Sequence, residues 1–100
     1  MNTFTATDLS GFNESTVLLF TAKWASPGKA MVSVIEELEG RYKGVTFHEI
    51  DAESNGELVS LLHVKAVPSL FFVRQGEVKS VLIGASKIEK VSSWIETALN

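Results

Sequence analysis

Two runs of nearly continuous apolar residues stand out along the chain, at Thr16–Thr21 and at Ser69–Val73. Such runs are typical of β-strands that are covered on both faces of a sheet. Val45–Ile50 alternates apolar and polar residues and predicts a half-buried strand. After a tight turn at Gln75-Gly76, Glu77–Ile83 is predicted to return as the antiparallel partner of Ser69–Val73.

Apolar residues at helical spacing predict helices between these strands. The first long helix is expected to begin at Pro27, with Ser26 as its N-cap, and to end near Gly44. A short helix is predicted at Glu57–His63, after turn residues at Asp51–Gly56. The apolar positions of the long helix are Met31, Ile35, Leu38 and Tyr42.

The two ends of the chain complete the expected order of elements. Ser86–Glu89 matches a capping box and predicts the start of a last helix, because apolar residues follow at helical spacing. We also expect a first strand at Thr3–Ala6 and a short helix at Asp8–Asn13. The resulting order, β-α-β-α-β-α-β-β-α, predicts an α/β fold in which a mixed sheet carries helices on both faces.

Composition narrows the class of protein. The chain has 100 residues, 45% of them hydrophobic, and only two prolines, which indicates one domain over residues 1–100. A formal charge of −3 excludes a dominant phosphate-binding surface, so no nucleic-acid partner is expected. No apolar run approaches the roughly 18 residues that would suggest a membrane span, and no signal peptide is evident. We therefore expect a monomeric cytoplasmic or nuclear protein with no membrane contact.

The absence of cysteine removes a whole class of chemistry. Without sulfur nucleophiles the chain has no disulfide, no thiolate metal ligand and no catalytic thiol. His48 and His63 do not have the spacing of a metal-binding pair, so no metal site and no cofactor are expected. Ser26 lies outside a nucleophile motif, and its predicted N-cap role accounts for it.

Three separated segments resemble the thioredoxin family. They are Trp24-Ala25-Ser26-Pro27-Gly28-Lys29 after a buried strand, Val67-Pro68-Ser69 before another, and Ile83-Gly84-Ala85 after the hairpin. In that family the first segment reads W-C-G-P-C-K, the second holds a cis-proline, and the third closes the same surface. The resemblance therefore implies a thioredoxin fold, built from a βαβ and a ββα unit, with a cis-proline before the fourth strand.

This sequence departs from the family at the residues that carry redox chemistry. Ala25 and Gly28 occupy the two cysteine positions, and Leu19 stands where the family commonly buries an aspartate that assists proton transfer. Thiol–disulfide exchange requires a thiolate that attacks sulfur, which neither alanine nor glycine can provide. We therefore expect no catalytic residue and no enzyme activity.

A narrower resemblance is to the N-terminal thioredoxin-like domain of multidomain monothiol glutaredoxins. It rests on the segments Val45–Phe47, Asp51–Glu53, Ala66–Phe72 and Gly76–Val78, and on Ala25 after the tryptophan. This resemblance implies a docking domain of a longer protein involved in iron–sulfur and iron homeostasis. The cluster would belong to the glutaredoxin domain, which these 100 residues do not contain.

The predicted function is a redox-inactive module that binds a protein or an extended peptide at the former redox face. Trp24 is expected either to anchor a partner at the rim of that face or to pack beneath the following helix. Alternatives are a thioredoxin oxidoreductase whose cysteines were replaced, and an accessory subunit of a larger enzyme. The expected binding residues are Trp24, Ala25, Ser26, Pro27, Gly28, Val67, Pro68, Gly84 and Ala85.

Overall fold

The computed structural model describes residues 2–3, 8–24 and 27–100, and its elements follow the order expected from the sequence with one exception. The predicted first helix is missing from that order. The elements are β1 (Asn2–Thr3), β2 (Thr16–Thr21), α1 (Pro27–Arg41), β3 (Thr46–Asp51), α2 (Gly56–Leu62), β4 (Ser69–Arg74), β5 (Glu77–Ile83) and α3 (Ile88–Leu99).

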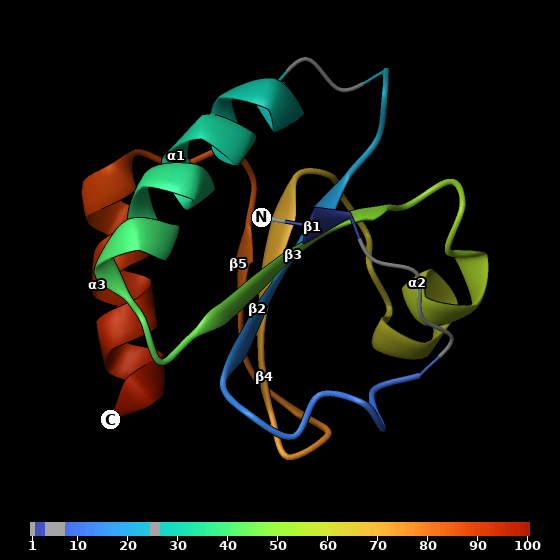
Figure 1. Cartoon of the computed structure of the whole chain (residues 1–100). Helices are drawn as coiled ribbons and strands as arrows, with labels where there is room; N and C mark the ends of the chain where they lie inside the picture. Colours follow the sequence, from blue (N-terminus) through green and yellow to red (C-terminus); the bar gives the residue numbers. More distant parts are fainter. Residues whose placement is uncertain (1, 4–7, 25–26) are drawn as a thin grey trace.

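The strands form one mixed sheet in the order β1-β3-β2-β4-β5. β1 and β2 run parallel to β3, whereas β4 runs antiparallel to both of its neighbours, β2 and β5. α1 and α3 cover one face of the sheet, and α2 lies on the other face (Figure 1). The predicted α/β architecture, a mixed sheet with helices on both faces, is confirmed.

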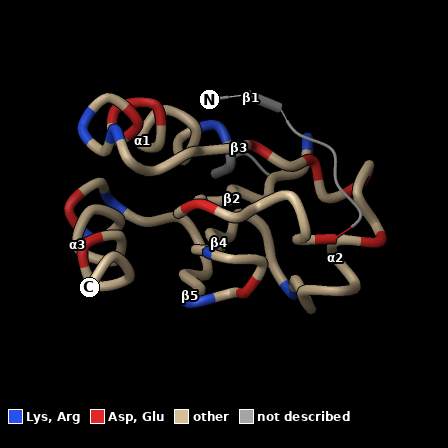
Figure 2. Tube along the Cα trace, turned by 60° about the horizontal axis from the view of Figure 1, so that its bottom comes forward, with Lys and Arg blue, Asp and Glu red and all other residues tan. Residues whose placement is uncertain are grey.

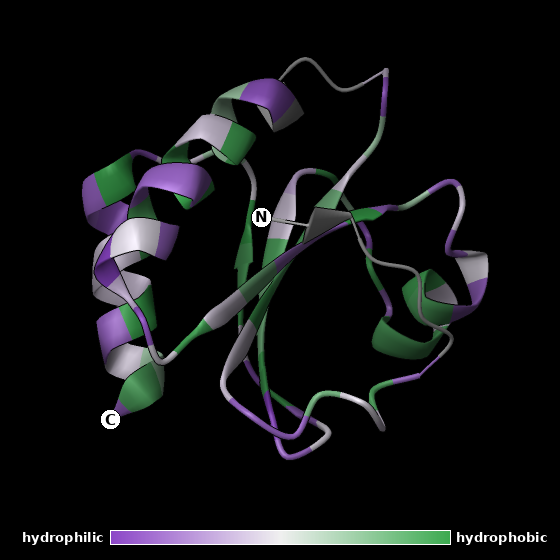
Figure 3. Cartoon of the chain, in the orientation of Figure 1, coloured by the Kyte–Doolittle hydropathy of each residue, from purple (hydrophilic) through white to green (hydrophobic). Residues whose placement is uncertain are grey.

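β2 lies at the centre of the core, because all six of its residues are buried. Val17 and Leu19 point toward α1 and α3, where they join a cluster that also contains Met31, Ile35, Leu38, Val45, Phe47, Leu70, Phe72, Val91 and Ile95. Leu18 and Phe20 point toward α2 and join Leu9, Phe12, Ile50, Leu58, Phe71 and Val73. Figure 3 shows hydrophobic residues concentrated along the central strands and recurring along the helices.

The surface carries charges of both signs. Figure 2 shows acidic and basic positions distributed over helices, strands and loops. Two exposed ion pairs join Arg41 to Glu37 on α1, at 3.5 Å, and Lys79 to Glu77 on β5, at 2.9 Å. Exposed pairs of this kind contribute little to stability. In the part of the chain that the structure describes, no helix is long and apolar enough to cross a membrane.

The short helix predicted at Asp8–Asn13 is wrong, because this segment forms a turn. Oδ1 of Asp8 accepts hydrogen bonds from the backbone N–H and the hydroxyl of Ser10, at 3.0 and 2.6 Å. The N–H of Phe12 donates to the carbonyl of Leu9 at 3.0 Å. Bonds from Asp and Ser side chains to nearby backbone compete with helical hydrogen bonds, which explains the difference.

Several other boundaries shift by one to three residues. α1 ends at Arg41 and not near Gly44, because the N–H of Val45 donates to the carbonyl of Tyr42 at 3.1 Å and closes a turn. α2 begins and ends one residue earlier than predicted, since His63 adopts a left-handed backbone with a φ of 55°. β3 begins and ends one residue later than predicted, and β4 ends one residue later.

The capping box predicted at Ser86–Glu89 is also wrong. Lys87 is the N-cap of α3, and no side chain caps this helix. The carbonyl of Lys87 accepts hydrogen bonds from the N–H groups of Lys90 and Val91, both at 3.1 Å. The helix therefore begins one residue beyond the position that the sequence motif requires.

Two expectations fall on residues outside the described part of the chain. The predicted strand Thr3–Ala6 is represented only by β1 at Asn2–Thr3, because residues 4–7 are not described. Ser26, the predicted N-cap of α1, is likewise not among the described residues.

The partial burial of His48 makes the stability of the fold depend on pH. The sequence places His48 facing outward on β3, yet its ring is partly covered, with its centroid 5.9 Å from that of Phe12. Burial lowers the pKa of His48 below its ordinary value of 6.5, and attraction to Glu39 opposes this only in part. The unfolded chain thus takes up a proton at a higher pH than the folded chain.

We therefore predict that the free energy of unfolding decreases as the pH falls through about 6.5. His48→Gln removes this titration, so the variant should lose less stability over the same interval. Urea unfolding at about pH 7.5 and about pH 5 measures both values. An equal or larger loss in the variant would show that His48 does not contribute.

Candidate functional site

The strand register brings the three family-like segments to one edge of the sheet. Phe20, near the end of β2, pairs with Ser69 at the start of β4, and Ser69 pairs with Ile83 at the end of β5. The residues that follow β2, precede β4 and follow β5 therefore emerge side by side. These are the segments that begin with Trp24, end with Pro68 and contain Gly84.

A hydrogen bond joins two of these segments directly. The N–H of Gly84 donates to the carbonyl of Pro68 at 2.9 Å. The Val67–Pro68 peptide bond is cis, Pro68 is buried, and Val67 remains partly exposed while its side chain packs against the core cluster on the α2 side. The loop before β4 is thus fixed by burial on one side and by Gly84 on the other.

Trp24 lies on the surface, with 71% of its area exposed. This exposure excludes packing beneath the following helix and leaves the indole available at the rim of the sheet edge. Among the described residues it has the highest exposure of any large hydrophobic side chain. Trp94, by contrast, is half-buried, and its Nε1–H donates to Oγ of Ser80 at 2.8 Å, so it serves packing.

Gly84 adopts a backbone conformation that suits glycine, with a φ of +90°. A Cβ added there would meet no atom within 4 Å, so the conformation and not the lack of space requires glycine. Ala85, the next residue, is exposed. This turn carries the chain across the sheet edge and presents Ala85 to solvent.

The remaining expected binding residues are only partly placed. Ala25 and Ser26 lie outside the described residues. Pro27 and Gly28 form the first residues of α1, which puts the backbone of position 28 at the beginning of that helix. The structure therefore joins the Pro68 loop to the Gly84 turn by a hydrogen bond, and the strand register directs the segment that contains Trp24 to the same edge of the sheet.

One contact at this edge was missed by the sequence interpretation. Met31 is buried in the core, as predicted, but its Sδ also accepts a hydrogen bond from the N–H of Ser86 at 3.3 Å. This bond joins the second turn of α1 to the segment that follows Gly84. The sequence interpretation assigned Ser86 only a capping role. It could not predict this bond, because no sequence pattern indicates a hydrogen bond between a backbone amide and a distant thioether.

The described part of the site contains neither cysteine nor a cluster of metal-binding side chains. Leu19, at the position of the family's buried aspartate, is fully buried between Glu49 on β3 and Leu70 on β4 in the strand register. Within residues 2–3, 8–24 and 27–100, no group of three His, Cys, Asp or Glu side chains could hold a metal ion. The described features of the site are an exposed indole, a cis-proline loop and a glycine turn.

Comparison with known proteins identifies the family. The family model described as Thioredoxin matches residues 2–97, nearly the whole chain. The chain belongs to the thioredoxin family. Its thioredoxin fold is thus supported both by the sheet topology and by the match to the family model.

Individual relatives come from more than one branch of this family. Thioredoxin H3 of Arabidopsis thaliana is 30% identical over 88 residues, which cover 85% of this chain and 75% of that protein. Thioredoxin-like protein CXXS1 of the same plant is 35% identical over 82 residues, covering 79% of this chain and 70% of the relative. Monothiol glutaredoxin-4 of Saccharomyces cerevisiae is 34% identical over 89 residues, covering 87% of this chain but 36% of that longer protein.

The conformation of Gly84 leads to a stability prediction. Gly84→Ala should lower the free energy of unfolding by about 1–3 kcal/mol, because a side chain is strained at positive φ even where space is open. Gly40→Ala on α1 is the matched control, since a Cβ there also meets nothing within 4 Å. In a helix this change should stabilise by about 0.5–1 kcal/mol. Denaturant unfolding that gives both variants the same sign would contradict the prediction.

Proposed function

We propose that this chain is a redox-inactive thioredoxin-like module that binds a protein or an extended peptide. The proposed binding face is formed by Trp24, Ala25, Ser26, Pro27, Gly28, Val67, Pro68, Gly84 and Ala85. The observation that carries the proposal is a combination. Ala25 and Gly28 occupy the two cysteine positions, while a cis Val67–Pro68 bond and a hydrogen bond from Gly84 to Pro68 define the adjoining loops. The chemistry is lost and the surface remains.

The backbone at Val67 supports recognition of an extended segment. Neither the N–H nor the carbonyl of Val67 has a hydrogen-bond partner among the described residues. An incoming peptide in extended conformation satisfies such groups by adding main-chain hydrogen bonds, as in strand addition. Trp24 supplies a large amphipathic contact at the rim, of the kind that contributes strongly to interfaces.

We further propose that the module is the docking domain of a monothiol glutaredoxin with a role in iron–sulfur and iron homeostasis. The similarity to Monothiol glutaredoxin-4 supports this, because the match covers most of this chain and about a third of that protein. The chain itself has no cysteine thiolate for a cluster, so it would act by binding partners. A Cys-Gly-Phe-Ser segment encoded downstream would support this assignment, and a stop codon directly after Asn100 would contradict it.

The purified chain should have no disulfide reductase activity, because no sulfur nucleophile is present at positions 25 and 28. An insulin reduction assay with a dithiol electron donor measures this. Ala25→Cys combined with Gly28→Cys should permit a disulfide but give only slow turnover, since Leu19 cannot transfer a proton. Activity of the unmodified chain above the protein-free background would overturn the proposal, and full thioredoxin activity of the double variant would refute the role given to Leu19.

Charges introduced at the proposed face should prevent partner capture. Val67→Arg and Ala85→Glu place charge beside the cis-proline loop, and Ala85 is exposed, so the second change should leave the fold intact. Glu36→Lys on the exposed surface of α1 is the control. In a pull-down from cell extract, we expect both face variants to lose the partners that the control retains. If both face variants retain these partners and Glu36→Lys loses them, the docking surface lies on α1 and the proposed face is wrong.

A further inference from the structure

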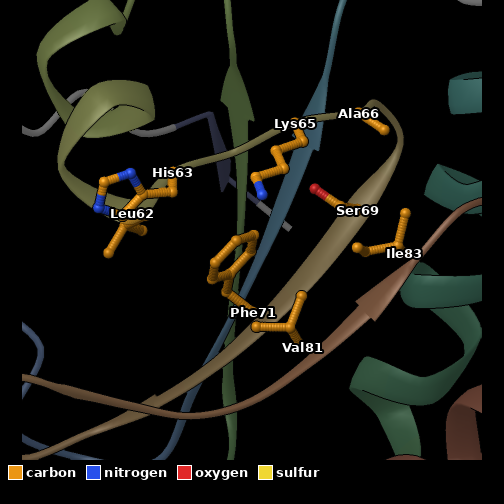
Figure 4. A pocket seen from close by; sticks show the side chains of 8 residues that line it. All are labelled: Leu62, His63, Lys65, Ala66, Ser69, Phe71, Val81 and Ile83. Carbon is orange, nitrogen blue, oxygen red and sulfur yellow. The ribbon is translucent and has the colours of Figure 1, made fainter.

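A pocket adjoins the proposed binding face on the α2 side of the sheet. Its volume is about 280 Å³, and its lining comes from the end of α2, the loop before β4, and strands β4 and β5 (Figure 4). Ala66 precedes Val67, and Ile83 precedes Gly84, so this pocket begins where the proposed face ends. Leu62, Phe71, Val81 and Ile83 make its walls largely apolar.

Part of the apolar wall of the pocket is more exposed to solvent than side chains on a covered sheet face usually are. Val81 and Ile83 on the edge strand β5 are 41% and 61% exposed. The opposite face of β5 behaves differently, because Leu82 packs against the core cluster under α1 and α3. α2 thus leaves the outer part of its sheet face uncovered, beside the pocket.

A buried hydroxyl group in the pocket lacks a partner. Ser69 is only 2% exposed, and its Oγ accepts or donates no hydrogen bond among the described residues. Burying a hydroxyl without a hydrogen bond is unfavourable, and such groups are commonly satisfied by water or a ligand. Figure 4 shows this Oγ pointing into the pocket, toward the side chain of Lys65.

The polar groups around the pocket favour a negatively charged ligand. Lys65 and His63 line it, whereas no acidic residue does. Figure 4 shows the side chain of Lys65 extending into the pocket, with its ammonium group between Phe71 and Ser69 in this view. Lys65 takes part in neither of the ion pairs found among the described residues. In a chain with a net charge of −3, this is a locally basic, apolar hollow.

We propose that this pocket binds an apolar side chain of a partner peptide, with a neighbouring carboxylate of that peptide placed against the ammonium group of Lys65. The proposal deepens the proposed function and rests on it, because the same peptide continues from the face around Val67. The size agrees with this occupant. The pocket volume of about 280 Å³ lies just below the roughly 300–1,000 Å³ that is typical of small-molecule sites. A single peptide side chain with its flanking group therefore fits this pocket better than a whole small molecule.

Selection from a random peptide library on the wild-type chain tests the chemistry of the ligand. The enriched peptides should carry an aliphatic or aromatic residue next to Asp or Glu. The most enriched peptide, synthesised with a fluorescent label, is then the probe for Kd measurements. Failure to enrich any peptide, or enrichment of basic peptides, would overturn the proposal.

Variants of the pocket locate the site. Ile83→Lys should raise the Kd of the probe about tenfold, and Lys65→Glu should raise it roughly three- to tenfold. Lys90→Glu on α3 causes the same change in net charge at an exposed position and should leave the Kd unchanged. A probe with its acidic residue replaced by lysine should bind Lys65→Glu more tightly than the wild type.

The same measurements separate this inference from the proposed function. If Val67→Arg and Ala85→Glu weaken the probe while both pocket variants bind normally, the pocket proposal is wrong and the binding face stands. If only the pocket variants weaken it, the binding face is wrong and the pocket stands. A wild-type dimer in analytical ultracentrifugation that Ile83→Lys dissociates would show that a second copy of the chain is the occupant, which overturns the peptide proposal.

Discussion

The burial of β2 on both faces is the constraint on which the rest of the structure depends. Its six residues pair with β3, and Thr16–Phe20 also pair with β4. The apolar side chains of β2 divide between the two core clusters. Because β2 is fixed in this way, its end, the start of β4 and the end of β5 must meet at one edge of the sheet. The proposed binding face and the adjoining pocket follow from that register, and neither requires a cysteine.

The geometry of the proposed binding face does not depend on cysteine. In the thioredoxin family the segments at this edge serve thiol exchange, yet the geometry around Pro68 depends on burial and on the hydrogen bond from Gly84. Neither of these two interactions involves a sulfur atom. Leu19 extends the change into the core, where an apolar side chain packs in the cluster under α1 and α3 without the cost of a buried carboxylate. The absence of cysteine is therefore compatible with this fold.

Sequence patterns predicted the strands and helices whose positions follow from hydrophobic periodicity. They failed at turns and caps, where the hydrogen bonds of single residues determine the local structure. The apolar runs located β2 and β4, and the helical spacing located α1 and α3, because burial imposes those patterns directly. The turn at Asp8–Asn13 and the N-cap at Lys87 depended on local hydrogen bonds that compete at similar energies. The resemblance located the loops of the site, but the exposure of Trp24 and the unpartnered Ser69 hydroxyl follow from tertiary packing, which no local pattern encodes.

We propose that this thioredoxin-family chain binds a partner at the sheet edge where the family commonly carries two cysteines. The most direct measurement is NMR mapping of backbone amide shifts during titration with the most enriched peptide. The account predicts the largest changes at Trp24, Val67 and Gly84, continuing to Ile83 on β5, with little change along the exposed side of α1. Changes concentrated at Glu36–Glu39, with the cis-proline loop unaffected, would contradict it.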